Sequence, residues 1–551
     1  MQRIGPPVDH SRCGEAGCAA ENVVEDTYVT AHAAQCNQDG NPNCVHVGPV
    51  VSEVAAILEA DDLPLLELKR DGSNQNVQLR VVSYKDSVSY TALSHVWADG
   101  MGNPHANTLP QCQINRLHRL LTPIASQSSL KNRIFGSRAK SETVYLWIDT
   151  LLIPLQKKLR KKAISRMYDI YKNAKTVLVL DRTLLDVSAD RPAEELCFRL
   201  SAASWMRRAW TLQEGALANN LYVQFHERAV NPVKLAEKAY QRIWKSEPWN
   251  VILEECGTVI NYITQSGDAG GDEQLHSVLL GLGQRSTSHP EDKEICFAVM
   301  LKMDMKRILD AEGAERTVRI LKQMPYIPYS FLWHFQQDLD VPGFTWVPKN
   351  IISTGGGVPQ LGLKLTEEGL LVDEQALIFR SRTHYLNKSA QHIRDVSTGK
   401  WYALRWEGDV AAIAQKLDDT NRTWTALAAL PNRRTMFSLH HAVVLRLDWT
   451  LDSASPEELL RHAADQATTK GEFVGRGRLE ELDRATCERM KAQTGVKQEQ
   501  LEDFKQAVRR GESSMEGVSE AIRRVCEEED DDSWYILDGQ MLTASRKWLV
   551  T

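Results

Sequence analysis

A tryptophan and a glutamate stand four residues apart, at Trp210 and Glu214. On a helix this spacing puts both side chains on one face. An aromatic ring beside a carboxylate suits a sugar–nucleotide ligand, because the ring can stack on a base while the carboxylate faces ribose hydroxyls or a developing oxocarbenium charge. The pattern predicts Glu214 as a candidate catalytic residue and Trp210 as part of its binding site.

Further polar side chains are expected beside this pair. Ser94, His95 and Trp97 follow one predicted strand, Asp149 ends a second, and Arg208 lies on the predicted helix of the tryptophan–glutamate pair. In an open parallel sheet, ligands bind at the carboxyl ends of the strands. We therefore assign Ser94, Trp97, Asp149 and Arg208 to ligand binding.

Each of these residues also has a purely structural interpretation. Trp210 can be a core aromatic, and Glu214 can pair with a neighbouring arginine or cap a helix. Asp149 and Asp181 follow strands, where aspartate commonly caps the next helix. These alternatives stay open on the sequence alone.

The elements that must position these residues alternate along the chain. Apolar runs predict buried strands, and apolar positions at helical spacing predict amphipathic helices. The strands are expected at residues 90–96, 144–149, 176–181 and 221–225, and the helices at 157–174 and 192–218, the latter broken near Ser204. Such alternation predicts an α/β fold with parallel βαβ units and right-handed crossovers.

Composition changes divide the rest of the chain. We expect a Cys/His-rich N-terminal region at 1–80, the α/β domain at 81–230, a mainly helical region at 231–340, a β-rich region at 341–455 and a helical tail at 456–551. Within the first region, apolar patterning over residues 51–82 predicts a helix and two short strands.

Cysteine and histidine gather near the N-terminus. Cys13 and Cys18 form a C-x4-C spacing, and His32 and Cys36 form an H-x3-C spacing. Thiolate and imidazole groups are the ligands that Zn²⁺ prefers, and an ion would tie down a loop-rich segment. These four residues are the predicted Zn²⁺ ligands, and the alternative is a set of free or buried thiols.

Four blocks within residues 90–214 resemble, in order, the blocks of fungal HET (heterokaryon incompatibility) domains. They are YTALSHVW at 90–97, LWIDTLLIP at 146–154, AISRMYDIYKNAKTVLVLD at 163–181 and WMRRAWTLQE at 205–214. The HET pattern usually has a cysteine in its second block, where this chain has Leu152. The stretch after the first block resembles a HET subgroup with a long N-terminal extension, consistent with the Cys-rich head.

The resemblance implies a TIR-like fold, with a parallel sheet of the TIR or flavodoxin type. Many TIR domains hydrolyse NAD⁺ with a glutamate in a W-x-x-x-E helix, and residues 210–214 fit that spacing. By this resemblance Glu214 would stabilise a ribosyl cation as nicotinamide leaves. Asp149 and the loop after it would lie where TIR domains have a self-association loop. Other TIR domains are assembly modules without enzymatic activity.

Composition narrows the functional classes. The chain has 551 residues, of which 42% are hydrophobic and 25% are charged. Its net charge is -6, so it lacks the excess of positive charge that is typical of nucleic-acid-binding proteins. The apolar stretch at 144–155 contains Asp149 and is too short to span a bilayer. We expect a cytoplasmic protein that binds protein partners or itself through its HET domain.

Three functions remain open at this stage. The first is a HET module of self/non-self recognition and cell-death signalling. The second is an NAD⁺ glycohydrolase using Glu214, which is compatible with the first. The third is a non-catalytic, metal-stabilised scaffold for a protein partner.

Overall fold

The computed structural model divides the chain into two units, Met1–Gln323 and Met324–Thr551. The residues that the structure describes are 10–11, 13, 19, 22–34, 36, 44–70, 76–127, 143–243, 257, 272–334, 336–354, 362–381, 390–395, 398–408, 413, 425–431, 439–447, 468–483, 485–486 and 536–551. Within them, no helix combines the length and the apolar character needed to cross a membrane.

The first unit is built on a seven-stranded sheet with the order β3-β2-β6-β4-β7-β8-β9. Its strands are β2 (Pro64–Arg70), β3 (Val77–Ser83), β4 (Thr91–His95), β6 (Thr143–Trp147), β7 (Thr176–Leu180), β8 (Leu221–Gln224) and β9 (Ala229–Val230). The four central strands are parallel, whereas β2, β3 and β9 are antiparallel to their neighbours. The predicted α/β class and its four parallel strands are therefore confirmed.

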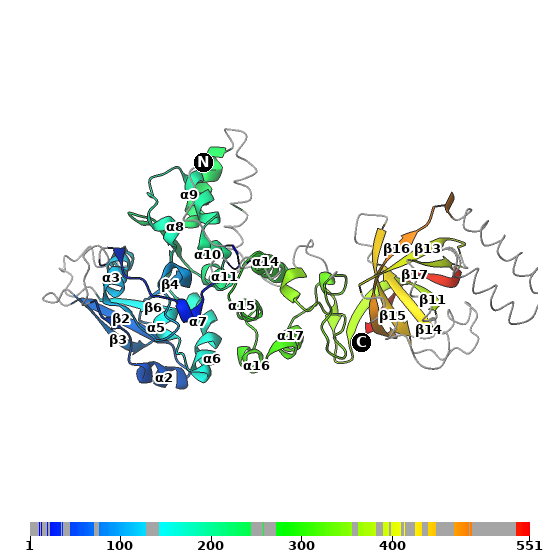
Figure 1. Ribbon diagram of the computed structural model, residues 1–551, viewed down its shortest axis with the longest axis horizontal. Coiled ribbons are helices and arrows are strands. Elements are labelled where there is room, and N and C mark those ends of the chain that lie inside the picture. Colours follow the sequence, from blue (N-terminus) through cyan, green and yellow to red (C-terminus); the bar gives the residue numbers. More distant parts are fainter. Residues whose placement is uncertain are drawn as a thin grey trace, which may run out of the picture. The chain divides into compact units, whose positions relative to one another are not determined.

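Every residue of β4 and β7 is buried, as parallel strands covered on both faces require. The chain moves one way across the sheet from β4 to β6 and the other way from β6 to β7. Right-handed crossovers must then place the connecting helices on opposite faces. Accordingly, α3 (Gln111–Gln127) packs on β3 and β6, and α6 (Lys157–Ser165) lies beside α2 (Val51–Glu59) on the other face (Figure 1).

Two predicted helices are each divided. Residues 157–174 form α6 and then α7 (Met167–Asn173), after the short α5 (Asp149–Leu152). The predicted helix at 192–218 is divided into α9 (Ala193–Ser201), α10 (Ser204–Arg207) and α11 (Ala209–Ala216), so the predicted break near Ser204 is confirmed, and α8 (Arg182–Leu185) precedes it. The helix α11 packs against β4 and α7.

Short elements lie before β2 and between β4 and α3, and further helices follow β9 within the first unit. The short elements are η1 (Glu25–Thr27), β1 (His46–Val47), η2 (Trp97–Asp99) and β5 (Leu109–Pro110), with β1 and β5 paired antiparallel. The helices are α12 (Pro232–Ile243), α14 (Asp272–Gly283), α15 (Asp292–Met300), α16 (Met305–Leu309) and α17 (Gly313–Leu321).

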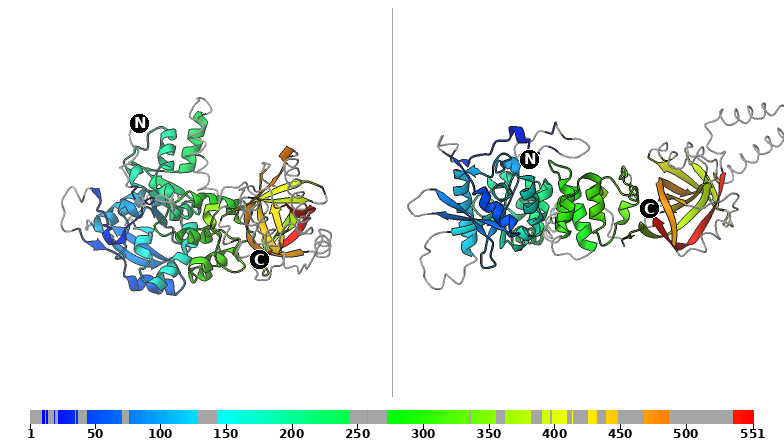
Figure 2. Two further views of the ribbon diagram at one scale, coloured as in Figure 1. Left: turned by 45° about the vertical axis from the view of Figure 1, so that its right-hand side comes forward. Right: turned by 90° about the horizontal axis from the view of Figure 1, so that it is seen from below.

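The second unit contains an eight-stranded sheet that closes on itself, because β17 pairs with β11, β12 and β16 (Figure 2). Its elements are η3 (Tyr329–Phe331), η4 (Ile351–Thr354), β10 (Lys364–Leu365), β11 (Leu370–Ser381), β12 (Gln391–Asp395), β13 (Trp401–Glu407), β14 (Thr425–Pro431), β15 (Leu439–Leu447), β16 (Thr468–Glu481) and β17 (Ile536–Val550). Side chains such as Leu377, Phe379 and Val444 fill its core.

The predicted helical tail at 456–551 is wrong where the structure describes it as β16 and β17. Much of β16 alternates exposed and buried residues, which is the period of a strand. Its lysine, glutamate and arginine side chains gave the segment a polar composition that hid this alternation. Pairing with distant strands decides the conformation, since local propensity is a weak guide where tertiary pairing competes.

Candidate functional site

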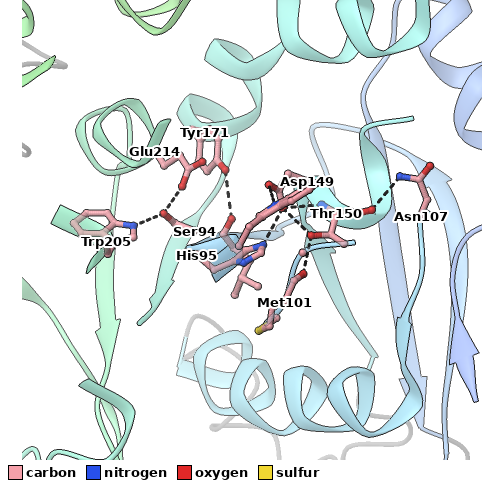
Figure 3. A network of polar contacts seen from close by, with 12 residues as sticks. Ser94, His95, Met101, Asn107, Asp149, Thr150, Tyr171, Trp205 and Glu214 are labelled. Atoms are coloured by element: carbon pink, nitrogen blue, oxygen red, sulfur yellow. Dashed lines mark hydrogen bonds and ion pairs between the residues drawn. The ribbon is translucent and has the colours of Figure 1, made fainter. Parts of the chain in front are cut away.

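The carboxyl group of Glu214 lies against the end of β4. Ser94 Oγ donates a hydrogen bond to Glu214 Oε2, and Trp205 Nε1 donates to Ser94 Oγ at 2.6 Å (Figure 3). Glu214 is 5% exposed, and both partners are fully buried. The serine hydroxyl therefore links an indole N–H to a buried carboxyl group.

A break in the helix brings Trp205 and Glu214 to the same serine. Arg208 has an extended backbone between α10 and α11, so the two residues lie on different helices. Backbone carbonyls at a helix end lack hydrogen-bond donors within the helix. At this break, the guanidinium of the buried Arg285 supplies such donors. Its Nη1 donates to the carbonyls of Arg208 at 2.9 Å and Trp205 at 3.3 Å.

Burial raises the pKa of Glu214 to about 7. The hydrogen bond from Ser94 opposes this rise, while the nearby Asp149 carboxylate adds to it. Tyr171, whose hydroxyl donates to the Leu93 carbonyl of β4 at 3.4 Å, also lowers the pKa of Glu214. Near neutral pH, Glu214 is therefore divided between its acid and its carboxylate forms, as a proton-transferring group requires.

A second carboxyl group, Asp149, lies beside the same strand end. It accepts from Trp97 Nε1 at 2.8 Å and from the Thr150 amide at 2.6 Å, and its Oδ1 lies 2.9 Å from His95 Nε2. Burial alone would raise the pKa of Asp149, but His95 and the two donors lower it overall. This carboxyl is therefore ionised at neutral pH.

The histidine of this pair is buried. Burial lowers the pKa of His95, but the adjacent Asp149 carboxylate outweighs it and raises the pKa overall. Within the described part of the chain, His95 Nδ1 has no hydrogen-bond partner. Because His95 directly follows Ser94, two groups of side chains meet at consecutive residues of β4. We call them the Glu214 cluster and the Asp149 cluster. The first contains Glu214, Ser94, Trp205 and Tyr171, and the second contains Asp149, His95 and Trp97.

The loop after η2 fixes Trp97 beside Asp149. A Cβ atom on Gly102 would lie 2.5 Å from Trp97 Cδ2, so the ring can pack there only against a glycine. Thr150 Oγ1 donates to the Met101 carbonyl at 2.8 Å, and Asn107 Nδ2 donates to the Thr150 carbonyl at 2.9 Å. These bonds fasten the loop to α5.

Residues 90–184 match the family model described as heterokaryon incompatibility protein (HET). The chain carries a HET domain. No curated protein and no solved structure matches the chain. The matched residues include Ser94, His95, Trp97, Asp149 and Tyr171, and they end before Trp205 and Glu214. The hydrogen bonds to Ser94 thus join a following segment of the chain to the HET domain.

Two predicted ligand-binding residues bind partners away from these clusters. Trp210 Nε1 donates to Asp292 Oδ2 at 2.8 Å, and Arg208 donates to Asn22 Oδ1 at 2.8 Å and to Ser288 Oγ at 3.2 Å. Glu214 lies apart from them because its carboxyl turns toward β4. The other predicted residues, Ser94, Trp97 and Asp149, lie in the two clusters and within the residues that match the HET model.

Three residues of the clusters were not predicted as site residues. They are His95, Tyr171 and Trp205. His95 had a usable signal, since it stands beside Ser94 at the predicted strand end. In the sequence, Tyr171 and Trp205 resemble apolar core residues of helices. Only the packing of those helices brings their polar atoms to β4. By contrast, Asp181 caps α8 by accepting from the Thr183 amide at 2.8 Å, as its structural interpretation predicts.

The N-terminal ligands assemble differently from the prediction. His32, Cys36, Cys44 and Cys112 each offer one ligand atom, and these atoms lie within 4.8 Å of one another, so the group could hold a metal ion. Burial and the neighbouring thiols raise the pKa of Cys112 to about 12. Two predicted ligands, His32 and Cys36, belong to this group.

The other two predicted ligands do not enter it. Cys13 is exposed, and its Sγ lies 3.4 Å from His10 Nδ1 and accepts from the Ala19 amide at 3.2 Å. Cys18 lies outside the described residues. Spacing pointed to neighbours in sequence, whereas folding brings Cys112, the second residue of α3, to His32 from 80 residues away.

Proposed function

We propose that this protein is a HET-domain module of self/non-self recognition and cell-death signalling, and that its signal is the hydrolysis of NAD⁺ at Glu214. The HET domain supports a function in heterokaryon incompatibility. The similarity of HET to TIR domains, together with the parallel strands of the central sheet, supports a TIR-like module, and we propose that it acts in the cytoplasm.

The opposite pKa shifts of two neighbouring carboxyl groups carry the enzymatic part of the proposal. The pKa of Glu214 is raised to about 7, whereas the pKa of Asp149 is lowered. Environments that separate the pKa values of paired carboxyls are typical of acid–base sites. Glycosidic bond cleavage uses two carboxyl groups in this way.

The reaction follows from these states. The bond between ribose C1′ and the nicotinamide nitrogen breaks, and its electron pair leaves with nicotinamide. The Glu214 carboxylate stabilises the ribosyl cation. Water then attacks C1′, and Glu214 accepts the proton that water loses, giving ADP-ribose. Asp149 remains ionised beside His95 and Trp97 and adds negative potential to the same strand end.

The burial of Glu214 supports control by assembly. Since its side chain is only 5% exposed, a nucleotide needs a rearrangement of the surrounding residues to reach it. Self-association of HET domains, or binding of a protein partner, supplies such a rearrangement by stabilising the open form. Signalling and catalysis are then two parts of one function.

The test is NAD⁺ consumption by the full-length protein, alone and fused to an inducible dimeriser. We expect turnover on dimerisation and its loss in Glu214→Gln. A matched control is Glu53→Gln on α2, which removes an exposed glutamate outside the clusters and should leave turnover unchanged. Absence of turnover in the dimerised wild type, or equal turnover in Glu214→Gln, would refute the enzymatic proposal and favour a non-catalytic assembly module.

A further inference from the structure

We propose that His32, Cys36, Cys44 and Cys112 bind one Zn²⁺, and that this ion holds the N-terminal segment over the loop that carries Trp97. This metal site does not depend on the proposed NAD⁺ cleavage, so either proposal can fail without the other. Zinc binding would then be required to keep the loop that carries Trp97, which follows β4, in its ordered position.

The donor set and its spacing fit zinc. A tetrahedral zinc with bonds of about 2.3 Å to sulfur and about 2.0 Å to nitrogen sets its ligand atoms roughly 3.5–3.8 Å apart. The Sγ atoms of Cys36 and Cys112 each lie 3.6 Å from His32 Nδ1. Three thiols with one imidazole form a closed structural set, and soft sulfur ligands select zinc over magnesium or calcium.

Two backbone features around Cys112 would stabilise its sulfur as a metal ligand. Cys112 is the second residue of the 17-residue helix α3, where the helix dipole and open N–H groups stabilise negative charge. The Ala33 amide donates to Cys112 Sγ at 3.2 Å. Backbone donors to the sulfur are the outer-shell contacts expected of a zinc-bound cysteine.

The four ligands come from separate parts of the chain. His32 and Cys36 lie in the N-terminal segment, Cys44 lies two residues before β1, and Cys112 belongs to α3. The strand β1 pairs with β5, which directly precedes α3. An ion at this point would therefore tie the N-terminal segment to the start of α3.

The segment next to His32 is bonded to the Trp97 loop. Tyr28 accepts from the Gly102 amide at 2.9 Å and donates to the Trp97 carbonyl. Thr30 Oγ1 donates to the Gly102 carbonyl at 2.7 Å, and the Ala31 amide donates to the Gly100 carbonyl at 2.8 Å.

Because Trp97 Nε1 donates to Asp149, a continuous set of bonds leads from the metal ligands to the candidate site. An ion that immobilises His32 would restrain this set, because residues 28–32 have little apolar core of their own. The zinc would thus position the site without touching it.

The first measurement is the metal content of the full-length protein purified without chelator. We expect one zinc per chain in the wild type, less than a tenth of that in Cys44→Ser and Cys112→Ser, and full content in the control Cys13→Ser. Tetrahedral cobalt bands after Co²⁺ exchange would report the same geometry. Zinc-free wild type that also fails to take up Zn²⁺ or Co²⁺, a disulfide among the three cysteines, or full zinc content in Cys112→Ser would overturn the site.

The second measurement tests the link to the loop in the wild-type protein, so that no variant has to fold. Hydrogen exchange is compared before and after zinc removal with a chelator and after zinc is restored. We expect the amides of residues 100–102 to exchange about tenfold faster without zinc, and β7 to be unchanged. Equal exchange at residues 100–102 in both states would refute the coupling.

Discussion

The substitution Glu214→Gln should stabilise the first unit at alkaline pH. Burial raises the pKa of Glu214 from 4.5 to about 7, so the folded state prefers the protonated side chain. This preference is fully present below pH 4.5 and is lost as the pH rises through 7. Each pH unit between these values lowers the free energy of unfolding by about 1.4 kcal/mol, or roughly 3 kcal/mol in all. Glutamine keeps the shape of the acid and carries no charge, so it avoids this loss.

The assay is urea unfolding followed by circular dichroism at several pH values from 5 to 8.5. The difference in unfolding free energy between Glu214→Gln and the wild type should rise by about 3 kcal/mol over this range. The control Glu53→Gln, on the surface of α2, should change stability by less than about 0.5 kcal/mol at every pH. A difference for Glu214→Gln that does not change with pH would show that burial does not shift this carboxyl, and the acid–base argument would fail with it.

Four further outcomes are expected. NAD⁺ turnover should rise with pH through about 7, because Glu214 acts as a carboxylate; a rate independent of pH between 6 and 8 would contradict this. Asp149→Asn should destabilise the first unit by about 2 kcal/mol, since it removes a charged hydrogen-bond acceptor, measured by the same urea assay. Gly102→Ala should cost about 1–3 kcal/mol, because a Cβ atom there overlaps the Trp97 ring, and a melting temperature equal to the wild type would refute the close contact. Trp210→Phe should lower the free energy of unfolding by about 1 kcal/mol through one lost hydrogen bond and leave NAD⁺ turnover unchanged. A large loss of turnover would instead show that the Trp210 indole contacts the substrate.

The sequence was a good guide wherever a local pattern carried the information. The four central strands were predictable because buried parallel strands are continuous apolar runs, and parallel pairing followed from their alternation with helices. Asp181 and the break near Ser204 were predictable for a similar reason, since caps and breaks depend on adjacent residues.

The candidate site was only partly predictable. Ser94, Trp97 and Asp149 follow from their places at strand ends, and Glu214 from its spacing to Trp210. That spacing nevertheless pointed to the wrong neighbour, since the indole of Trp210 binds Asp292, while Ser94 provides the contact of Glu214. A shared helix face fixes which residues are adjacent on the helix, but not which side chain turns toward the sheet.

By itself, the sequence determined the central α/β sheet, the HET blocks and the acidic residues near the strand ends, because these depend on local periodicity and short motifs. Only the tertiary structure decided the rest. It brought Cys112 to His32, turned Trp205 toward Ser94, and made strands of Thr468–Glu481 and Ile536–Val550. These outcomes rest on contacts between residues far apart in the chain, whose energies come from packing and pairing that no local window of sequence contains.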